Sequence, residues 1–545
     1  MTSSTLFLSN IMNVPVFFSI GEAVAAVAII LAVYQIKKDD WETPLEIRDH
    51  VVPVTVILIG LGIAAEIAAS IMSTTEPRTI LELSLTWQIL ASLLIIGSFI
   101  YLVMNSKKKG LFNERTYNRF FESLKKRVAY RSPKQMDAVA DILIMNLDDL
   151  LKQVSPAPLS GHSTAIAKSA HDTLRKIVAD SSFTRYVVEF RADFLTSFIK
   201  GIKEYHGYID TLTITFNAII RAAFYNKNSY LYDELRREGL GYGRPLLNDI
   251  FCDQRIFLDF KPLNEIAFGG EQMVDSDRLD LFISALDLAI KGYWDKGVYI
   301  DFEGSAFDNA FAILETTFGN IVSEIKTSDQ ELDVSFIRKF QLIPFFVNWI
   351  FVHRYEDALK ANQVPEEELN VQQETRSYGN CPKSLTAGYA ELIFRLLCSL
   401  SRSLNEESKR VTSILIAGDI LVFYHRTNLK NIRTALLDYI WKDPLSGVDS
   451  NLQGYYPSIL PIVLSLIAMW QDGGSQERKE LYNSVVTFLN TKLKPKILAG
   501  DKMANGELME HALLPREVTF DRGKGLFIWK SPQYGGGEQE MIIRS

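Results

Sequence analysis

VVPVTVILIGLGIAAEIAASIM, residues 51–72, is an almost entirely apolar stretch with a single ionisable side chain, Glu66. An α-helix needs about 20 such residues to cross the ~30 Å hydrocarbon core of a bilayer. Two similar stretches flank it, at about residues 14–34 and 83–104. The first of these is not expected to be a signal peptide, because no basic segment precedes it and two more apolar stretches follow at once. The sequence therefore predicts an integral membrane protein with three N-terminal transmembrane helices.

The basic residues between the apolar stretches predict the side of the membrane on which each loop lies. Lys37, Lys38 and Arg48 follow the first stretch, whereas the loop after the second contains only Arg78. A run of three lysines, residues 107–109, follows the third stretch. Because cytoplasmic loops are enriched in lysine and arginine, we expect the N-terminus outside the cell and the bulk of the chain in the cytoplasm.

Two carboxylates lie inside the apolar stretches. Glu22 lies in the first and Glu66 in the second, and their positions along the helices place both in the outer half of the bilayer. An ionised carboxylate that faces lipid costs several kcal/mol, so such a residue usually faces a helix bundle or a watery cavity. One interpretation is that each glutamate is protonated or hydrogen-bonded to Gln88 or Ser92 of the third helix. The other is that Glu22, Glu66 and Gln88 line a cation-selective pore, which three helices per chain can enclose only in an oligomer.

A strongly basic segment, residues 105–134, directly follows the third apolar stretch and is called the basic belt below. It holds ten lysines and arginines against two acidic residues, although the whole chain has a net charge of −7. One interpretation is contact with anionic lipid headgroups, worth about 1 kcal/mol per basic residue near the surface. The other is a basic vestibule that binds an anionic ligand, with Tyr117, Phe120 and Phe121 stacking on nucleobases. The ligand-binding candidates of the basic belt are Lys107, Lys108, Lys109, Arg115, Arg119, Lys125, Lys126 and Arg127.

A second candidate ligand site lies at residues 221–244, where tyrosines alternate with basic residues and the sequence GLGYGRP follows. Tyrosines can stack on bases, arginines can pair with phosphates, and a glycine loop lets backbone amides approach an anion. The alternative interpretation is a tyrosine-rich helix surface that ends in a turn. The ligand-binding candidates here are Arg236, Arg237 and Arg244.

The remaining sequence predicts a mainly α-helical chain. Ser132 and Pro133 form a helix start, a capping hydroxyl followed by proline at the first helical position, and apolar residues then recur at helical spacing as far as about residue 495. No series of alternating strands interrupts this pattern. Only the tail from about Pro515 is β-prone, and its glycines predict a terminal hairpin. We expect four parts: a transmembrane domain at 1–104, the basic belt at 105–134, an α-helical cytoplasmic sensor domain at 135–500, and a tail with a small β-hairpin at 501–545.

Motifs that carry catalytic chemistry are missing from the sequence. It contains no Walker A motif, no HExxH, no G-x-S-x-G and no Cys/His cluster with metal-binding spacing. Its three cysteines are far apart and are expected to be buried free thiols. The acidic residues Asp275, Asp277 and Asp280 lie at a predicted helix start, where acids stabilise the helix dipole. We therefore expect no catalytic residues, no metal site and no cofactor, and predict that the protein is not an enzyme.

The organisation of the chain resembles that of membrane effectors in bacterial antiphage defence systems. Three spans, the sequence KKKG at 107–110 and a long helical part without motifs are most similar to the transmembrane effector of Hailong-type systems. The resemblance implies a homotetrameric ion channel in the bacterial inner membrane, held shut by short DNA oligomers bound in a basic cytoplasmic cavity. It also implies a partner nucleotidyltransferase that makes those oligomers.

Three functions follow as hypotheses, and the one ranked last is a membrane-tethered hydrolase or nuclease with an unrecognised site, because no acid/base or metal constellation is present in the sequence. The first is an oligomeric ion channel or pore-forming effector, gated by a nucleotide or short oligonucleotide that favours one conformation of the cytoplasmic helical domain. The second is a membrane-anchored binding or scaffold protein that forms no pore.

Overall fold

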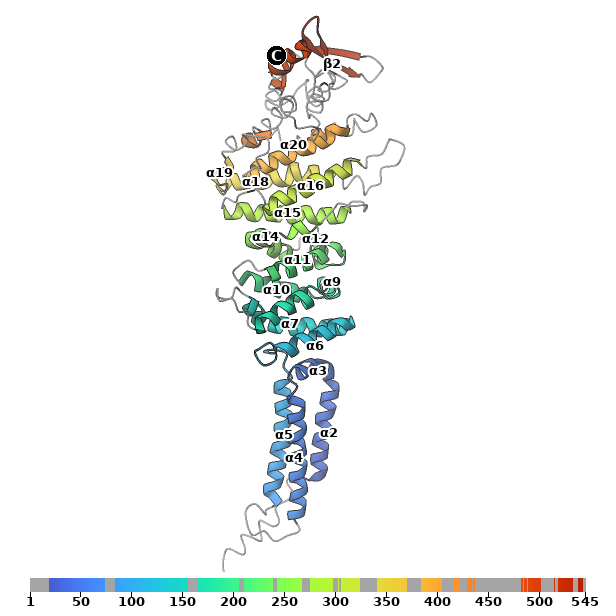
Figure 1. Cartoon of the computed structure of the whole chain (residues 1–545), viewed down its shortest axis with the longest axis vertical. Coiled ribbons are helices and arrows are strands. Elements are labelled where there is room, and N and C mark those ends of the chain that lie inside the picture. Colours follow the sequence, from blue (N-terminus) through green and yellow to red (C-terminus); the bar gives the residue numbers. More distant parts are fainter. Residues whose placement is uncertain are drawn as a thin grey trace, which may run out of the picture. The chain divides into compact units, whose positions relative to one another are not determined.

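The computed structural model describes residues 19–73, 84–154, 165–204, 210–238, 243–266, 275–297, 302, 305–323, 341–369, 384–403, 413, 416–421, 429–433, 435–436, 482–483, 485–487, 489–500, 514, 518–532 and 538–542. Over these residues the chain is mainly helical, as the sequence predicts. It divides into two compact units, Met1–Tyr230 and Leu231–Ser545, whose elements are labelled in Figure 1. The four parts expected from the sequence stay a prediction.

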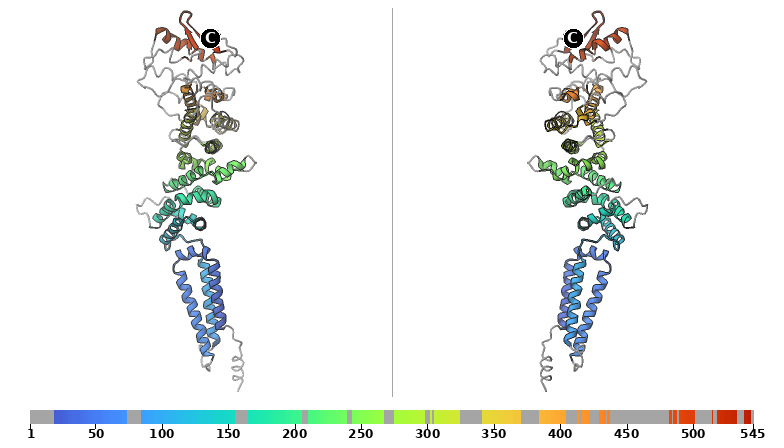
Figure 2. Two further views of the ribbon diagram at one scale, coloured as in Figure 1. Left: turned by 90° about the vertical axis from the view of Figure 1, so that its right-hand side faces the viewer. Right: turned by 90° about the vertical axis from the view of Figure 1, so that its left-hand side faces the viewer.

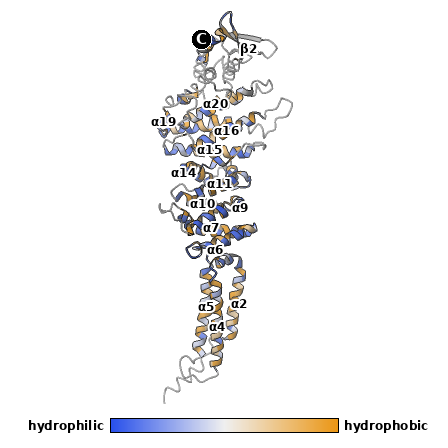
Figure 3. Ribbon diagram, viewed as in Figure 1, coloured by the Kyte–Doolittle hydropathy of each residue, from blue (hydrophilic) through white to orange (hydrophobic). Residues whose placement is uncertain are grey.

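Three apolar helices begin the first unit: α2 (Ile20–Ile36), α4 (Val51–Met72) and α5 (Ser84–Asn105). α4 and α5 are each long and apolar enough to cross a membrane, and α2 becomes a third candidate span together with residues 41–47, which follow it at an angle of 101°. Figures 1 and 2 show the three helices side by side, and Figure 3 shows their apolar character. Ile29 and Leu93 are 63% and 65% exposed. Such exposed apolar surface suits contact with lipid.

The start of α2 is defined by Ser19 and Glu22. Residues 1–18 lie outside the described residues, and α2 begins at Ile20 with a capping box. The Ser19 hydroxyl accepts a hydrogen bond from the Glu22 amide at 3.3 Å, and the Glu22 carboxylate accepts one from the Ser19 amide at 2.7 Å. A serine followed three residues later by glutamate is the sequence signature of this motif. Glu22 therefore lies in the first turn of α2 rather than well inside a helix.

Shorter helices make up the rest of the first unit. α3 (Lys38–Ile47) connects α2 to α4, and α6 (Tyr117–Tyr130) and α7 (Pro133–Val154) follow α5. The elements after them are α8 (Ala165–Thr173), η2 (Leu174–Val178), α9 (Ser181–Phe190), α10 (Ala192–Glu204) and α11 (Asp210–Tyr225). α7 begins at the predicted position, where the Ser132 hydroxyl accepts a hydrogen bond from the Gln135 amide at 3.3 Å. Arg191 leaves helical geometry at φ −130° and ψ 66°, which separates α9 from α10.

Helices also dominate the described part of the second unit. They are α12 (Tyr230–Glu238), α13 (Pro245–Leu247), η3 (Asn248–Cys252), α14 (Gln254–Phe260), η4 (Pro262–Glu265), α15 (Ser276–Lys296), α16 (Ala306–Ser323), η5 (Phe346–Phe351), α18 (Val352–Lys360), α19 (Glu366–Leu369), α20 (Leu385–Ser403), η9 (Leu489–Leu493) and α25 (Lys494–Ala499). α15 is capped by Asp275, whose carboxylate accepts a hydrogen bond from the Asp277 amide at 3.1 Å. α20 is capped by the buried Glu368 carboxylate, which accepts hydrogen bonds from the amides of Leu385 and Thr386.

The C-terminal tail forms the predicted hairpin and adds a third strand to it. β1 (Val518–Asp521) pairs antiparallel with β2 (Leu526–Pro532), which pairs antiparallel with β3 (Glu538–Ile542). In the turn between β1 and β2, the Asp521 side chain accepts hydrogen bonds from the amides of Gly523 and Lys524. An aspartate that bonds to the backbone two residues on is a common way to stabilise a turn. The hairpin is therefore set by residues close together in the sequence.

Candidate functional site at the end of the membrane helices

The Arg48 guanidinium joins the loop after α3 to the loop after α5. Its Nη1 donates hydrogen bonds to the carbonyl oxygens of Asn105 at 2.6 Å and Lys107 at 3.3 Å, and its Nη2 donates one to the carbonyl of Lys109 at 3.0 Å. The last carbonyls of a helix lack partners inside the helix, and a positive charge is favourable at this end of the helix dipole. Arg48 therefore fastens the end of α5 to the end of α3.

Acidic residues of α3 and of the loop after it neutralise part of the basic belt. Lys126 and Arg127 of α6 each lie 3.3 Å from the Glu46 carboxylate. Arg119, also on α6, pairs with Asp49. Because Arg127 is only 7% exposed, its charge would be costly without this carboxylate. The basic belt is therefore in part a structural contact between α3 and α6.

The sequence prediction missed this contact because it compared charges only within residues 105–134. The paired acids lie 70 to 81 positions earlier in the chain. KDDWETPLEIRD, residues 38–49, holds five acidic residues, so a signal was present. Sequence spacing alone could not show which helix this acidic segment, most of which forms α3, contacts.

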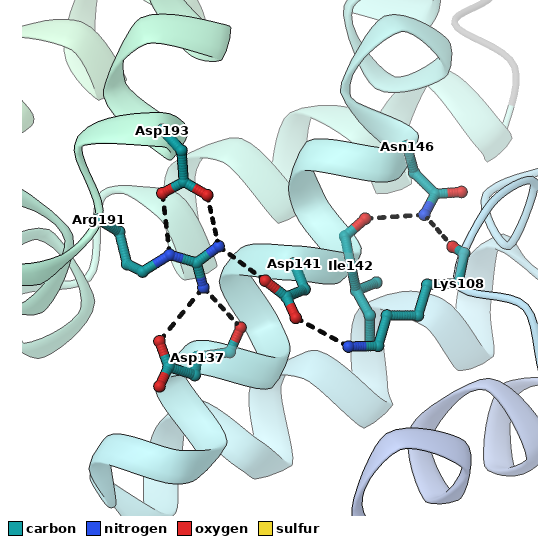
Figure 4. A network of polar contacts seen from close by, with 7 residues as sticks. All are labelled: Lys108, Asp137, Asp141, Ile142, Asn146, Arg191 and Asp193. Carbon is teal, nitrogen blue, oxygen red and sulfur yellow. Dashed lines mark hydrogen bonds and ion pairs between the residues drawn. The ribbon is translucent and has the colours of Figure 1, made fainter.

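A charged network links the loop after α5 to α7 and to the junction of α9 and α10 (Figure 4). Lys108 Nζ donates a hydrogen bond to Asp141 Oδ2 at 2.8 Å, and Arg191 Nη2 donates one to Asp141 Oδ1 at 2.7 Å. Arg191 also pairs with Asp193 at 2.8 Å and with Asp137 at 3.2 Å. Burial alone would raise the pKa of Asp141, but hydrogen bonds and charge from Lys108 and Arg191 outweigh it and hold that pKa below its ordinary value. Asp141 is thus the acceptor that both cations share.

Asn146 of α7 is 1% exposed and fixes the same loop through both ends of its amide group. Its Oδ1 accepts hydrogen bonds from the amides of Leu111 at 2.7 Å and Phe112 at 3.2 Å. Its Nδ2 donates to the carbonyls of Lys108 and Ile142, each at 2.7 Å (Figure 4). Buried polar groups are stable only when they are hydrogen-bonded. Asn146 therefore provides hydrogen-bond partners for the backbone of the loop after α5, and the loop provides partners for the Asn146 amide group.

Replacing Asp141 by asparagine is expected to lower the free energy of unfolding by about 1.5 kcal/mol at neutral pH, because charge-assisted hydrogen bonds are weakened at a partly exposed site. The pKa of Asp141 is lower in the folded chain than in the unfolded one, so its contribution is complete above about pH 4 and is lost as the pH falls through the folded pKa. The melting temperatures of the wild type and Asp141→Asn, measured in nanodiscs, should therefore approach each other as the pH falls from about 4 through the lower folded pKa. Asp149→Asn, on the same helix but outside the network, is the control. A difference that does not shrink as the pH is lowered below about 4 would contradict the prediction.

The ligand-binding candidates of the basic belt fall into two groups. One group pairs with carboxylates: Lys108, Arg119, Lys125, Lys126 and Arg127. The other group has exposed side chains and consists of Lys107, Lys109 and Arg115. The backbone carbonyls of Lys107 and Lys109 also accept hydrogen bonds from Arg48. In the described structure the first group thus meets acids of this chain, although Arg119, Lys125 and Lys126 remain exposed to solvent.

The candidates between residues 221 and 244 lie in the second unit. Arg236 pairs with Asp233 at 2.9 Å on α12, Arg237 is exposed, and Arg244 is half-buried just before α13. The Glu234 carboxylate accepts hydrogen bonds at 2.9 Å from two backbone amides of α13. These amides follow the predicted glycine loop, most of which lies outside the described residues. A carboxylate of the chain itself therefore binds the first amides of α13, and anion binding by the glycine loop stays a prediction.

The polar residues of the membrane helices differ in exposure. Glu66 on α4 and Gln88 on α5 are 4% and 8% exposed, whereas Glu22 is exposed at the start of α2. Oε2 of Glu66 is buried and accepts no hydrogen bond from the described residues. The Glu22 carboxylate is close enough for its charge to act on Glu66. One turn before Glu66, α4 approaches α5 closely at Gly62, where a Cβ would lie 2.8 Å from Ile95 Cγ1.

The described residues contain no group of three or more histidine, cysteine, aspartate or glutamate side chains that could hold a metal ion. Cys252 and Cys398 are free thiols, and Cys398 is buried. No protein-family model, curated protein or solved structure matches the chain. The three apolar helices and the polar junction at their end are therefore the features on which a function can be argued.

Proposed function

We propose that the chain is an oligomeric membrane protein whose apolar helices form an ion-conducting pore between copies. The observation that carries the proposal is the buried Oε2 of Glu66, which lacks a partner among the described residues and has Glu22 close by. An ionisable residue inside a membrane bundle is costly and usually marks an ion or proton pathway. Because α4 and α5 pack closely at Gly62 and Glu66 is buried among the helices of its own chain, the proposed pore lies between several copies, with the exposed Glu22 on its wall and Glu66 behind it. A ring of such glutamates favours cations.

Planar-bilayer recordings of the purified full-length protein test this proposal. We expect cation-selective currents, and we expect Glu66→Gln to lower the permeability ratio of cations to anions by about tenfold, which corresponds to ~1.4 kcal/mol. Glu22→Gln should have at least as large an effect, because the side chain of Glu22 is exposed and can face the space between copies. The matched control is Glu114→Gln, an exposed glutamate outside the apolar helices. If both variants keep the wild-type reversal potential, the acidic pore is wrong.

The polar junction is the route by which we propose that the helical part of the chain controls the pore. Arg48 fastens α3 to α5, while Lys108 and Asn146 fasten the loop after α5 to α7. A ligand that favours one arrangement of α7, α9 and α10 would therefore act on the end of α5. We propose that this ligand is a nucleotide or a short DNA oligomer and that a nucleotidyltransferase supplies it. Both proposals rest on the resemblance to antiphage effectors.

We also propose the orientation and assembly of the protein in the bacterial inner membrane. Two helices that could cross a membrane, together with the lysines at 107–109, support an external N-terminus and a cytoplasmic helical part. The proposal that the protein is a homotetramer rests on the resemblance to antiphage effectors. Protease protection in inverted vesicles would test the orientation, because digestion of the residues after Asn105 requires them to face the cytoplasm.

A membrane-anchored binding protein without a pore is the second candidate. The observation that favours it is the neutralisation of the basic belt by acids of α3, since such a contact serves an anchor as well as a channel. Absence of current under all conditions, from protein shown to be folded and reconstituted, would favour this function over the pore.

A further inference from the structure

A cavity of about 520 Å³ lies between α9 and α11 of the first unit. Its volume falls within the range of small-molecule sites, about 300–1,000 Å³. Side chains of three kinds matter for what it could bind: the arginines Arg185 and Arg221, the aromatic Tyr225, and the alanines Ala179, Ala218 and Ala222. Arg221 and Tyr225 come from the stretch 221–244 that the sequence singled out, whereas the other lining residues lie outside both candidate sites.

The charge of the lining suits an anion. Arg185 of α9 and Arg221 of α11 have exposed side chains, and none of the lining residues is acidic. Two acids lie on the same segments: Asp180 accepts hydrogen bonds from backbone amides at the start of α9, and Glu189 accepts one at 3.0 Å from Asn226, which lines the cavity. One carboxylate therefore lies beside the lining, where it balances part of the arginine charge. Guanidinium groups bind phosphate oxygens through paired, charge-assisted hydrogen bonds. A phosphate is therefore the anion that these residues fit best.

The rest of the lining suits a planar ring. Ala218, Arg221, Ala222 and Tyr225 are spaced three or four positions apart and so share one face of α11. The alanine side chains are small and leave a flat apolar surface. Tyr225 is 44% exposed, so part of its ring is available to stack on an aromatic group.

We propose that this cavity binds a phosphomonoester that carries a planar aromatic ring, with the phosphate against Arg185 and Arg221 and the ring against Tyr225. Binding itself does not depend on a pore. Any control of ion flow by this ligand rests on the proposed function.

Calorimetric titration of the full-length protein in nanodiscs tests the proposal. The probes are adenosine 5′-monophosphate, ribose 5-phosphate and adenosine, so that ring and phosphate are offered together and separately. We expect saturable binding of the nucleotide and weaker binding of the other two. Arg185→Gln and Arg221→Gln should each weaken nucleotide binding at least about tenfold. Tyr225→Ala should weaken it about fivefold or more while leaving ribose 5-phosphate binding unchanged.

Arg175→Gln is the matched control, because Arg175 is an exposed arginine of η2 that does not line the cavity. The melting temperature of each variant, measured in the same nanodiscs, separates loss of a contact from loss of folding. The proposal is overturned if the nucleotide does not bind saturably, if the cavity variants bind it as the wild type does, or if Arg175→Gln weakens it equally. Nucleotide binding by a protein that passes no current would refute the pore and support the cavity, and currents without nucleotide binding would refute the cavity alone.

Discussion

Asn146→Leu is expected to lower the free energy of unfolding of the first unit by about 4 kcal/mol. Leucine is similar in size to asparagine but cannot hydrogen-bond, so the amides of Leu111 and Phe112 and the carbonyl of Lys108 lose their partner. Each buried polar group left without a partner costs about 1–3 kcal/mol. For a unit of this size the melting temperature should fall by roughly 8–16 °C. Differential scanning calorimetry of the full-length protein in nanodiscs measures the change.

Hydrogen exchange shows whether the loss arises at the predicted place. Amides at residues 106–116 should exchange faster in Asn146→Leu, while those of β1 and β2 in the second unit keep their wild-type protection. Asn146→Asp is the matched variant, because its carboxylate still accepts from Leu111 and Phe112 but cannot donate to Lys108 when ionised. Its loss of stability should be about half as large. Wild-type melting and exchange in Asn146→Leu would mean that the loop is not held by this side chain.

The parts of the fold that the sequence predicted are set by residues close together in the chain. The apolar stretch at 51–72 is α4 almost to the residue, because length and hydropathy alone decide a candidate span. Ser132 and Pro133 begin α7 because capping needs only a hydroxyl and the next amides. The hairpin between β1 and β2 likewise depends on the turn after Asp521.

Two further side chains could have been recognised as buried from helical spacing. Arg127 lies seven positions after Phe120 and three after Leu124, and all three are buried on α6. Asn146 lies between the buried Leu143 and Leu147 of α7. A polar residue on the apolar face of a helix must find a partner. The pattern could have identified both residues as partnered, whereas the partners themselves are distant in sequence.

The candidate sites were harder to predict from the sequence than the fold, because they depend on contacts between residues that lie far apart in the chain. Tyr225 belongs to the stretch that the sequence singled out, yet Arg185 comes from a different helix 36 positions before Arg221, and no spacing rule joins them. The sequence also singled out Glu66, because a carboxylate inside an apolar stretch is unusual. Its burial and the approach of Glu22 depend on how α2, α4 and α5 pack, which composition does not specify.

Gly292→Ala is expected to destabilise the second unit by about 3 kcal/mol or more. α15 lies so close to the end of η3 that a Cβ at Gly292 would meet the Cys252 carbonyl oxygen at 2.1 Å and its carbon at 2.8 Å. Backbone atoms cannot rotate away as a side chain can, so α15 must shift. That shift would also strain the hydrogen bond of 2.8 Å from the Gln254 side chain to the Ala289 carbonyl. A fall in melting temperature of roughly 6–12 °C would follow.

Gly319→Ala is the matched control, because Gly319 also lies inside a helix of the second unit. A Cβ there would meet only Ser399 Oγ, at 3.9 Å, which is an ordinary contact. Alanine has a higher helix propensity than glycine and restricts the unfolded chain, so this variant should gain about 0.5–1 kcal/mol. The same chemical change is thus expected to act with opposite sign at two helical glycines that the sequence does not distinguish. Equal melting temperatures for the two variants would mean that α15 does not approach η3 as closely as the 2.1 Å contact requires.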